Sequence, residues 1–305
     1  MFMLKSIFGK WKQPIAYSFC EGTTKTPVLI RTIKEIVRAV HQTGLQIVAV
    51  VCDQAATNVA AINSLVNDTK ADYLRKGSEL RDRIIEVDGH QIIPIYDPPH
   101  LLKGISNNFL TKNILYKNKK EKTCVAKWQH IINAYIIDNP CGRLRLMKNL
   151  TDQHVYPAKI KKMKVSCCSQ VFSNRVASGI TRMSLDGSRS VDGSVSMEKD
   201  TLQTADLLLF FDDLFNSING NTRYPTQGKI LRSAVSNTSR HLRFWNEAIV
   251  MLKNMSFITL DGKQKSLPPS LKNWIITLEG FTLLQKKLQT LGFTYFLPRS
   301  IPSIP

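Results

Sequence analysis

Two short apolar runs that each end in an aspartate constrain this chain most. The first run is Ile47–Cys52, followed by Asp53, and the second is Ile92–Tyr96, followed by Asp97. Short apolar runs rich in β-branched residues are typical of strands buried on both faces, which occur in sheets covered by helices. Such sheets place metal-binding and phosphoryl-transfer carboxylates at the carboxyl ends of their strands. The alternative is that each aspartate only caps the helix that follows it.

Helical patterns lie between and after the two runs. Apolar residues at helical spacing predict helices from Thr26 to Gly44, over 55–66, and after the proline pair 98–99, which fits a first helical turn. Weaker alternation over 1–19, with a turn at Gly9, predicts two strands before them. The order of strands and helices predicts an α/β fold for this part of the chain.

The strand signal fades after about residue 123, and the rest of the pattern is helical. Helices are predicted over 128–137, 165–183, 204–218, 239–252 and from 270 onward. A Gly/Ser-rich stretch over 186–196 predicts a loop between them. We therefore expect an all-helical region over 123–265.

The sequence segments around the two aspartates resemble those of a known family. Val51–Asn58 (VCDQAATN) and Tyr96–Asn108 (YDPPHLLKGISNN) are similar to segments of the P-element and THAP-domain transposases. Other matching words follow in the family's order: Gly9–Tyr17, Leu150–Pro157, Gln170–Asn174, Asp213–Asn219 and Asn273–Phe281. The resemblance therefore covers nearly the whole chain.

This resemblance implies a fold and a function. The fold is an RNase H-like core, a truncated mixed sheet with helices, over 1–122 and 266–305, interrupted by a helical GTP-binding insertion domain over 123–265. The function is that of a fragment or domesticated derivative of a DNA transposase, which performs GTP-dependent cut-and-paste transposition. The alternative is a non-enzymatic, basic module that binds DNA or guanine nucleotide and supports assembly.

Transposases of this type use acidic residues to hold two Mg²⁺ or Mn²⁺ ions for phosphodiester cleavage and strand transfer. By resemblance, Asp53 is the second catalytic aspartate and a metal ligand. The family's first aspartate precedes the stretch matched here by Trp11–Gln13, and its glutamate follows the segment matched by 292–299. Neither has a match in this chain, and Glu279 lies too early to replace the glutamate. We therefore expect the chain to be catalytically inactive alone.

Asp97 and His100 offer a second pair of chemically capable side chains. A spacing of three places both on one helix face, where they would suit a hydrolytic pair or metal ligands. The word Asp-Pro-Pro-His is also ordinary helix-start chemistry, because Asp97 would cap the helix that Pro98 opens. We favour this structural or DNA-contacting role.

The sequence contains no Gly-rich Walker loop, so a P-loop nucleotide site is not expected. By resemblance, the guanine-nucleotide contacts are Lys164, Val165, Asp213 and Asn216. An aspartate can accept hydrogen bonds from the guanine N1 and N2 groups, and a lysine can hold a phosphate. The alternative is a solvated helix face with an ordinary Asp/Asn cap.

The charge indicates a polyanionic partner. The chain carries 42 Lys and Arg against 23 Asp and Glu, a formal net charge of +19, and lysines cluster in 112–122, 159–164 and 286–287. We therefore predict salt-sensitive DNA binding, although a generally basic proteome would give the same balance. The sequence has no Cys/His pattern of a zinc-coordinating DNA-binding domain, so the predicted binding is nonspecific.

The cysteines and apolar stretches bear on location. Six cysteines, Cys20 among them, form no Cys-x-x-Cys pair and predict reduced thiols, and no stretch predicts a leader peptide or a membrane span. We expect an intracellular protein, and the resemblance implies the nucleus. An unmatched sheet edge near the start of the chain predicts self-association into homo-oligomers.

Overall fold

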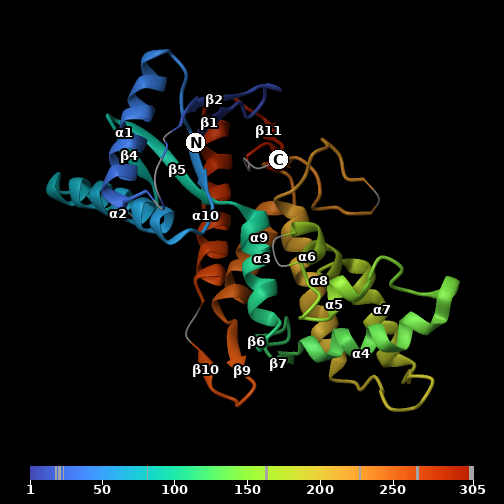
Figure 1. Ribbon diagram of the computed structural model, residues 1–305. Coiled ribbons are helices and arrows are strands. Elements are labelled where there is room, and N and C mark those ends of the chain that lie inside the picture. Colours follow the sequence, from blue (N-terminus) through green and yellow to red (C-terminus); the bar gives the residue numbers. More distant parts are fainter. Residues whose placement is uncertain are drawn as a thin grey trace. The chain divides into compact units, whose positions relative to one another are not determined.

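The computed structural model describes residues 1–17, 19, 22, 24–80, 82–161, 164–226, 228–265 and 268–301 (Figure 1). Cys20, the predicted boundary at 266 and part of the lysine cluster 159–164 lie outside the described residues. The chain divides into two compact units. The first comprises Met1–Pro98, Ile218–Trp245 and Asn273–Pro305, and the second comprises Pro99–Ser217 and Asn246–Lys272.

The first unit is built around a small mixed sheet. Its elements are β1 (Phe2–Lys5), β2 (Lys12–Ala16), α1 (Thr26–Gln42), β3 (Ala49–Cys52), α2 (Ala56–Arg75), β4 (Ile85–Val87), β5 (His90–Tyr96), β8 (Val235–Ser236), most of α10 (Pro269–Thr290), β11 (Tyr295–Phe296) and the 3-10 helix η2 (Pro298–Ser300). In the sheet, β3 runs parallel to β5, and β4 pairs antiparallel with the other edge of β5. The strands β1 and β2 form a separate antiparallel hairpin, as predicted, and β8 pairs with β11.

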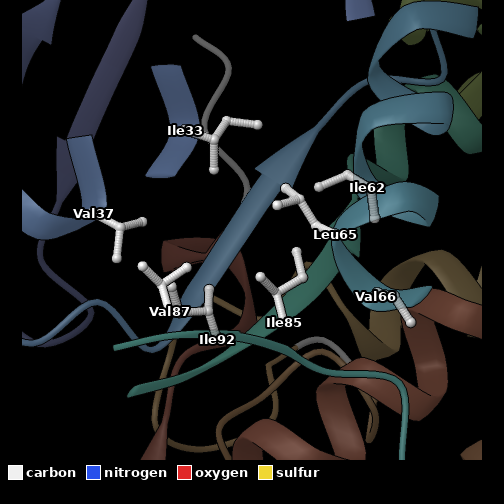
Figure 2. Packing of buried hydrophobic residues seen from close by; sticks show 8 residues of the cluster. All are labelled: Ile33, Val37, Ile62, Leu65, Val66, Ile85, Val87 and Ile92. Carbon is white, nitrogen blue, oxygen red and sulfur yellow. The ribbon is translucent and has the colours of Figure 1, made fainter. Parts of the chain in front are cut away.

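Apolar side chains of two helices pack against this sheet (Figure 2). The cluster consists of Ile33, Val37, Ile62, Leu65, Val66, Ile85, Val87 and Ile92. The helix α1 supplies the first two and α2 the next three, at the helical spacing that the sequence predicts. Each fully buried side chain of this size contributes about 1.5–3 kcal/mol. The helix α2 is longer than predicted, because it continues to Arg75.

The helix α10 lies close against β5. The Thr277 hydroxyl accepts a hydrogen bond from the Tyr96 N–H at 3.1 Å and lies 3.3 Å from the Tyr96 carbonyl oxygen. One turn later, a Cβ added to Gly280 would lie 3.0 Å from the carbonyl oxygen of Pro94. The small residue at position 280 therefore allows the helix to approach the strand backbone.

The second unit is mainly helical, as predicted for the middle of the chain. Its elements are most of α3 (Pro98–Phe109), β6 (Lys112–Lys117), β7 (Thr123–Ala126), α4 (Trp128–Asp138), the 3-10 helix η1 (Asn139–Leu144), α5 (Asp152–Val155), α6 (Val165–Val171), α7 (Asn174–Leu185), α8 (Thr201–Ser217), part of α9 (His241–Lys253), β9 (Ser256–Thr259) and β10 (Gln264–Lys265). The strands form an antiparallel sheet in the order β10-β9-β6-β7. This sheet adds strands to a region that the sequence predicts as all-helical.

Aromatic rings fill the core of the second unit. The Phe172 ring lies 5.4 Å from that of Phe211 on α8 and 6.4 Å from that of Phe109 on α3, and Trp128 stacks edge-on against Phe109 at 5.4 Å. Phe172 also separates α6 from α7, so the single helix predicted over 165–183 is two helices. Ser173 begins the second of them by accepting a hydrogen bond from the Val176 N–H.

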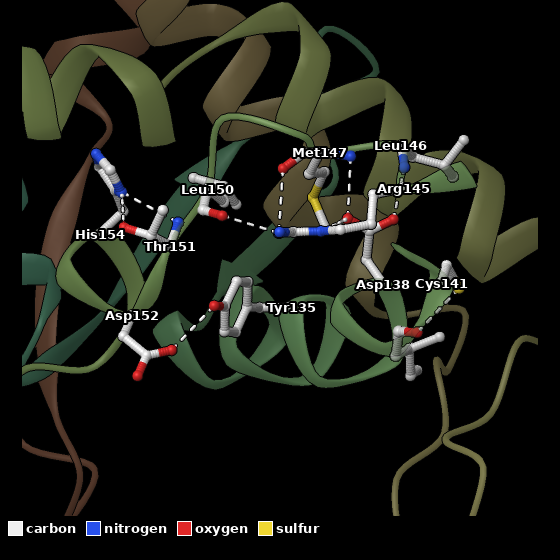
Figure 3. A network of polar contacts seen from close by, with 11 residues as sticks. Tyr135, Asp138, Cys141, Arg145, Leu146, Met147, Leu150, Thr151, Asp152 and His154 are labelled. Carbon is white, nitrogen blue, oxygen red and sulfur yellow. Dashed lines mark hydrogen bonds and ion pairs between the residues drawn. The ribbon is translucent and has the colours of Figure 1, made fainter. Parts of the chain in front are cut away.

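A buried ion pair organises the loop after α4 (Figure 3). The Asp138 side chain is 1% exposed and lies 3.3 Å from the Arg145 guanidinium. Its carboxylate also accepts hydrogen bonds from the N–H groups of Leu146 and Met147, at 2.6 and 3.0 Å. The Arg145 guanidinium in turn donates to the carbonyl oxygens of Met147 and Leu150. This buried charge is therefore paired and fully hydrogen-bonded, the condition under which a buried charge is tolerated.

Two sequence expectations concern the whole chain. The compact units divide the chain after Pro98, Ser217, Trp245 and Lys272. The predicted domain boundaries at 122 and 265 are a different division and stay a prediction. Among the described residues, none of the helices is both long enough and apolar enough to cross a membrane.

Candidate functional site

The structure brings Asp53 and Asp97 to the same edge of the first unit's sheet. The strands that precede them are parallel neighbours, and the last residues of the two strands, Cys52 and Tyr96, pair with each other. The Asp97 N–H donates to the Cys52 carbonyl oxygen at 2.8 Å, so the backbone pairing continues to the aspartate. The two aspartates therefore follow adjacent strand ends, which is where open α/β sheets place their ligand sites.

Local hydrogen bonds fix the Asp53 side chain. Its Oδ1 accepts from the Ala55 N–H at 2.9 Å and from the Asn58 side-chain amide at 2.8 Å. The first bond closes an Asx turn at the entry to α2, whose N-cap is Ala55 rather than Asp53, so Asp53 is not the helix cap that the alternative predicts. The Asp53 side chain remains half-buried. Oδ1 therefore holds the turn, while the carboxylate keeps contact with solvent.

Asp97 has a different environment. It is 0% exposed and directly precedes α3, the helix that its proline pair opens. Burial raises the pKa of the neighbouring Cys52 thiol to about 12, and the charges of Asp53 and Asp97 add to this effect. The thiol between the two aspartates is therefore held in its neutral form at physiological pH. His100 lies half-buried in the first turn of α3.

Asn273 is a residue near this site that the sequence analysis did not select. It is buried, and its side-chain amide donates to the Gln54 side-chain oxygen at 3.3 Å. The contact joins the residue after Asp53 to the start of α10, across 219 positions of sequence. No local sequence pattern predicts such a long-range contact. Asn273 is, however, the first residue of the segment Asn273–Phe281, which resembles the family.

Glu279 lies on α10, between two residues that approach the strand β5. Thr277 and Gly280 approach β5, and at about 100° per residue Glu279 points to a different side of the helix from Thr277. The side chain is half-buried. The expectation that Glu279 is not the family's catalytic glutamate stays a prediction.

The described carboxylates at this edge of the sheet are too few for a two-metal site. Such a site needs several hard oxygen ligands around two ions. Within the described part of the chain, no group of three or more His, Cys, Asp or Glu side chains could hold a metal ion. Asp97 is enclosed, and one oxygen of Asp53 is engaged in the turn. The described residues alone do not form a two-metal centre.

The residues selected for guanine nucleotide all lie in the second unit. Lys164 is exposed and immediately precedes α6, and Val165 is the first residue of that helix. Asp213 is half-buried on α8, and Asn216, one turn later, is only 6% exposed. Phe172 directly follows α6, and its ring lies 5.4 Å from that of Phe211 on α8, whereas Lys164 and Val165 lie at the opposite end of α6. The assignment of Lys164 to a phosphate and of Asp213 to the guanine base stays a prediction.

Two family models match the chain. The model of the TNP-like RNase H N-terminal domain matches residues 1–66, and that of the TNP-like GTP-binding insertion domain matches residues 99–231. The first match contains Asp53, and the second contains all four residues selected for guanine nucleotide.

Curated proteins and a solved structure point to the same family. The Transposable element P transposase of Drosophila melanogaster is 25% identical over 219 residues, which are 71% of this chain and 25% of that protein. The human DNA transposase THAP9 is 23% identical over 320 residues, which cover 99% of this chain and 31% of that protein. The chain thus spans between a quarter and a third of the length of these relatives. The Drosophila P element transposase strand transfer complex matches with a TM-score of 0.74 and 21% identity, over 98% of this chain and 61% of that chain, which shows a shared fold.

Proposed function

Because this chain belongs to the P element and THAP transposase family, we propose that it works in DNA transposition. In this proposal the first unit contributes Asp53 to a metal-dependent phosphodiester site, and the second unit binds GTP. The position of Asp53 supports the proposal best, since it directly follows β3 beside the end of its parallel neighbour β5. The proposed place of action is the nucleus, where the DNA substrate lies.

We propose further that this chain does not cleave DNA alone. A site that activates water or a 3′-hydroxyl with two metal ions needs more ligands than Asp53 supplies. Activity would then require further carboxylates, from residues outside the matched segments or from other chains. Incubation of the purified chain with duplex DNA and Mg²⁺ or Mn²⁺ should give no more cleavage than Asp53→Ala does. Cleavage that disappears in Asp53→Ala would contradict this part of the proposal.

The role of Asp53 itself is tested in a chimaera. This chain would replace the matching segment of the Drosophila P element transposase, so that the rest of that protein supplies whatever the segment lacks. Asp53→Ala should abolish strand cleavage by the chimaera. Asp186→Ala removes one exposed carboxylate from the same chain and should leave cleavage intact. If both variants cleave equally, Asp53 has only a structural role, in which its hydrogen bonds to Ala55 and Asn58 hold the turn before α2.

GTP binding is measured on the chain as it stands. A ligand at a hundred times its Kd stabilises the folded state by about 2.7 kcal/mol, so saturating GTP with Mg²⁺ should raise the melting temperature. Asp213→Asn should reduce the shift and weaken the preference for GTP over ATP, because the amide cannot accept both guanine hydrogen bonds. Asp186→Asn is the matched control in the same unit. An unchanged melting temperature with GTP would contradict the proposed nucleotide function.

The basic charge supports a second candidate function, nonspecific nucleic-acid binding without chemistry. The net charge of +19 and the exposed lysines Lys119 and Lys120 between β6 and β7 favour it. A gel-shift assay with the family's terminal sequences and scrambled duplexes separates the two candidates. Equal affinity for both duplexes, together with no GTP-induced stabilisation, would favour the non-enzymatic alternative.

A further inference from the structure

A histidine side chain ties the end of α1 to the start of β3. The helix α1 ends at Gln42, and Gly44, with a φ of 85°, reverses the chain while its N–H donates to the His41 carbonyl oxygen at 3.0 Å. Three residues later, the Ile47 N–H donates to Nε2 of the His41 ring at 3.1 Å. The ring therefore joins the last turn of α1 to the segment that enters β3.

This hydrogen bond defines the protonation state of the His41 ring. A backbone N–H can only donate, so Nε2 must carry a lone pair, and the ring is neutral with its proton on Nδ1. A protonated imidazole has an N–H group at both nitrogens and accepts no hydrogen bond. The bond from Ile47 and a proton on Nε2 therefore exclude each other.

The segment that this bond holds has few other anchors. Leu45 and Gln46 are exposed, and within the described residues no backbone hydrogen bond engages either of them. The pairing of β3 with β5 begins one residue after Ile47, where the Val48 carbonyl oxygen accepts from the Ile93 N–H at 3.0 Å. The segment can therefore open at the His41 bond without any loss of pairing in the sheet.

Charged and titratable groups from three elements surround the His41 ring. The His90 ring, at the start of β5, lies 4.1 Å from it between ring centroids. Asp88, in the turn between β4 and β5, is held by Arg38 of α1 through bonds of 2.9 and 3.3 Å. Lys287 of α10 adds another positive group. Of these groups only Asp88 attracts a proton to His41, and its charge is already paired with Arg38.

The net effect of this environment opposes protonation in the folded chain. Burial of the ring lowers the pKa of His41, and the charges of His90 and Lys287 lower it further. The Asp88 charge acts in the opposite direction, as does the carboxyl end of α1, where a positive charge is favourable. The lost bond from Ile47 is a further cost of protonation. Acid therefore favours the form in which Ile47 has left the ring.

We propose that His41 is a pH-sensitive latch on residues 43–47, the segment that leads into β3. The neutral ring holds the segment closed through the Ile47 N–H, and the protonated ring releases it while β3 stays paired with β5. Release detaches Ile47, which packs against the apolar cluster of α1, α2 and the sheet. The latch belongs to the fold of the first unit and depends neither on the role of Asp53 nor on GTP.

Amide exchange measured by NMR on the unaltered chain gives the first test. With each rate divided by that of an unfolded chain at the same pH, protection of the Ile47 N–H should be constant above pH about 6.5. Below that pH it should fall by up to about ten-fold for each pH unit, until His41 is protonated in the closed form as well. Protection of the Asp97 N–H, which donates to Cys52 at the other end of β3, should change less than about two-fold, because the opening is local.

Three outcomes would overturn the proposal. Protection of Ile47 that stays constant between pH 7 and pH 5 would show that the proton does not release the segment. An equal fall at Asp97 would show that acid unfolds the first unit as a whole, with no local latch. Nitrogen-15 chemical shifts report which ring nitrogen is protonated, and a proton on Nε2 of His41 at neutral pH would contradict the bond from Ile47.

Variants assign the pH dependence to one ring. His41→Gln removes the titration but keeps a side-chain acceptor, so protection of Ile47 should no longer depend on pH in this range. His154→Gln replaces a histidine of the second unit whose pKa burial also lowers, and should leave the pH dependence of Ile47 unchanged. His90→Gln should raise the pKa of His41 in the folded chain and so reduce the total fall in protection. A pH dependence that persists in His41→Gln would show that another group controls the segment, and the proposal would be wrong.

Discussion

The two units differ in how tightly their interiors are closed. In the second unit, Asp138 and Arg145 are buried together, and the hydrogen bonds of both end on nearby backbone groups of the same loop. In the first unit, Met3 of β1 and Ala49 and Val51 of β3 line a cavity of about 450 Å³. The second unit is fully paired by this closed network, whereas the first leaves space between its hairpin and β3. A closed network of buried hydrogen bonds supports stability, whereas a cavity gives up packing contacts.

The largest effect is expected where the closed network is broken. Asp138→Ala leaves the Arg145 guanidinium, whose side chain is 16% exposed, without its carboxylate and removes the acceptor of two backbone N–H groups. We expect a loss of about 3–5 kcal/mol in the free energy of unfolding, measured by urea denaturation. Asp186→Ala breaks an exposed pair with Arg182 and should cost less than about 1 kcal/mol. Similar losses in the two variants would contradict the contrast.

A smaller effect is expected from close approaches of the backbone. A Cβ added to Gly220 in the first unit would overlap the backbone of Ser233, whereas one added to Gly179 in the second unit would meet the flexible Met147 side chain at 3.0 Å. Gly220→Ala should therefore cost about 1–3 kcal/mol or more, and Gly179→Ala clearly less. Thermal unfolding of both variants measures the difference. The reverse order would mean that the first unit repacks more easily than the second.

Acid should destabilise both units through buried histidines. Burial lowers the pKa of His130 in the second unit and of His241 in the first below the ordinary value of about 6.5. The unfolded chain then binds more protons than the folded chain, so this contribution to stability is complete above pH about 6.5 and is lost as pH falls below it.

Denaturation at several pH values, with hydrogen exchange resolving the two units, measures this acid sensitivity. His130→Gln should reduce it in the second unit, and His241→Gln should reduce it in the first. Stability that stays constant between pH 7 and pH 5 would contradict the expectation. A variant that changes only the other unit would place the sensitive histidine elsewhere.

The smallest effect concerns exposed charge. Removing Lys119 and Lys120 together should weaken nonspecific DNA binding a few-fold and reduce the slope of log affinity against log salt by up to about 2, because each phosphate contact contributes about 0.9. Lys148→Ala removes another exposed lysine of the second unit as a control. An unchanged salt slope in the double variant would place the DNA contacts away from the β6–β7 turn.

Short-range patterns predicted much of the first unit and the start of α3. The run that ends at Tyr96 is β5, the proline pair opens α3, and the predicted helices there are present. Neither apolar run alone predicts that Asp53 and Asp97 lie side by side, because the parallel pairing of β3 with β5 depends on both strands. The role of Asp53 as a metal ligand stays a prediction.

The sequence analysis did not predict strand pairing between distant segments. The strand β9 pairs with β6 through Ile114 and Phe257, although more than a hundred residues separate them. Such a short strand has no periodicity of its own, and its identity depends on the edge it meets. The break of the predicted helix at Phe172 has a similar cause, because that ring packs in a core formed by distant helices. Tertiary contacts decide these elements, and local propensity does not.

The bond between Tyr96 and Thr277 has a consequence for synthesis on the ribosome. The two residues are 181 positions apart, and a ribosome adds about 5–20 residues each second. The strand β5 therefore waits roughly 10–40 s for the helix that covers it, while the whole of the second unit's first segment emerges. During that interval the nascent sheet is exposed to chaperones and to other chains, so slower translation between residues 97 and 277 would prolong its vulnerability to misassembly.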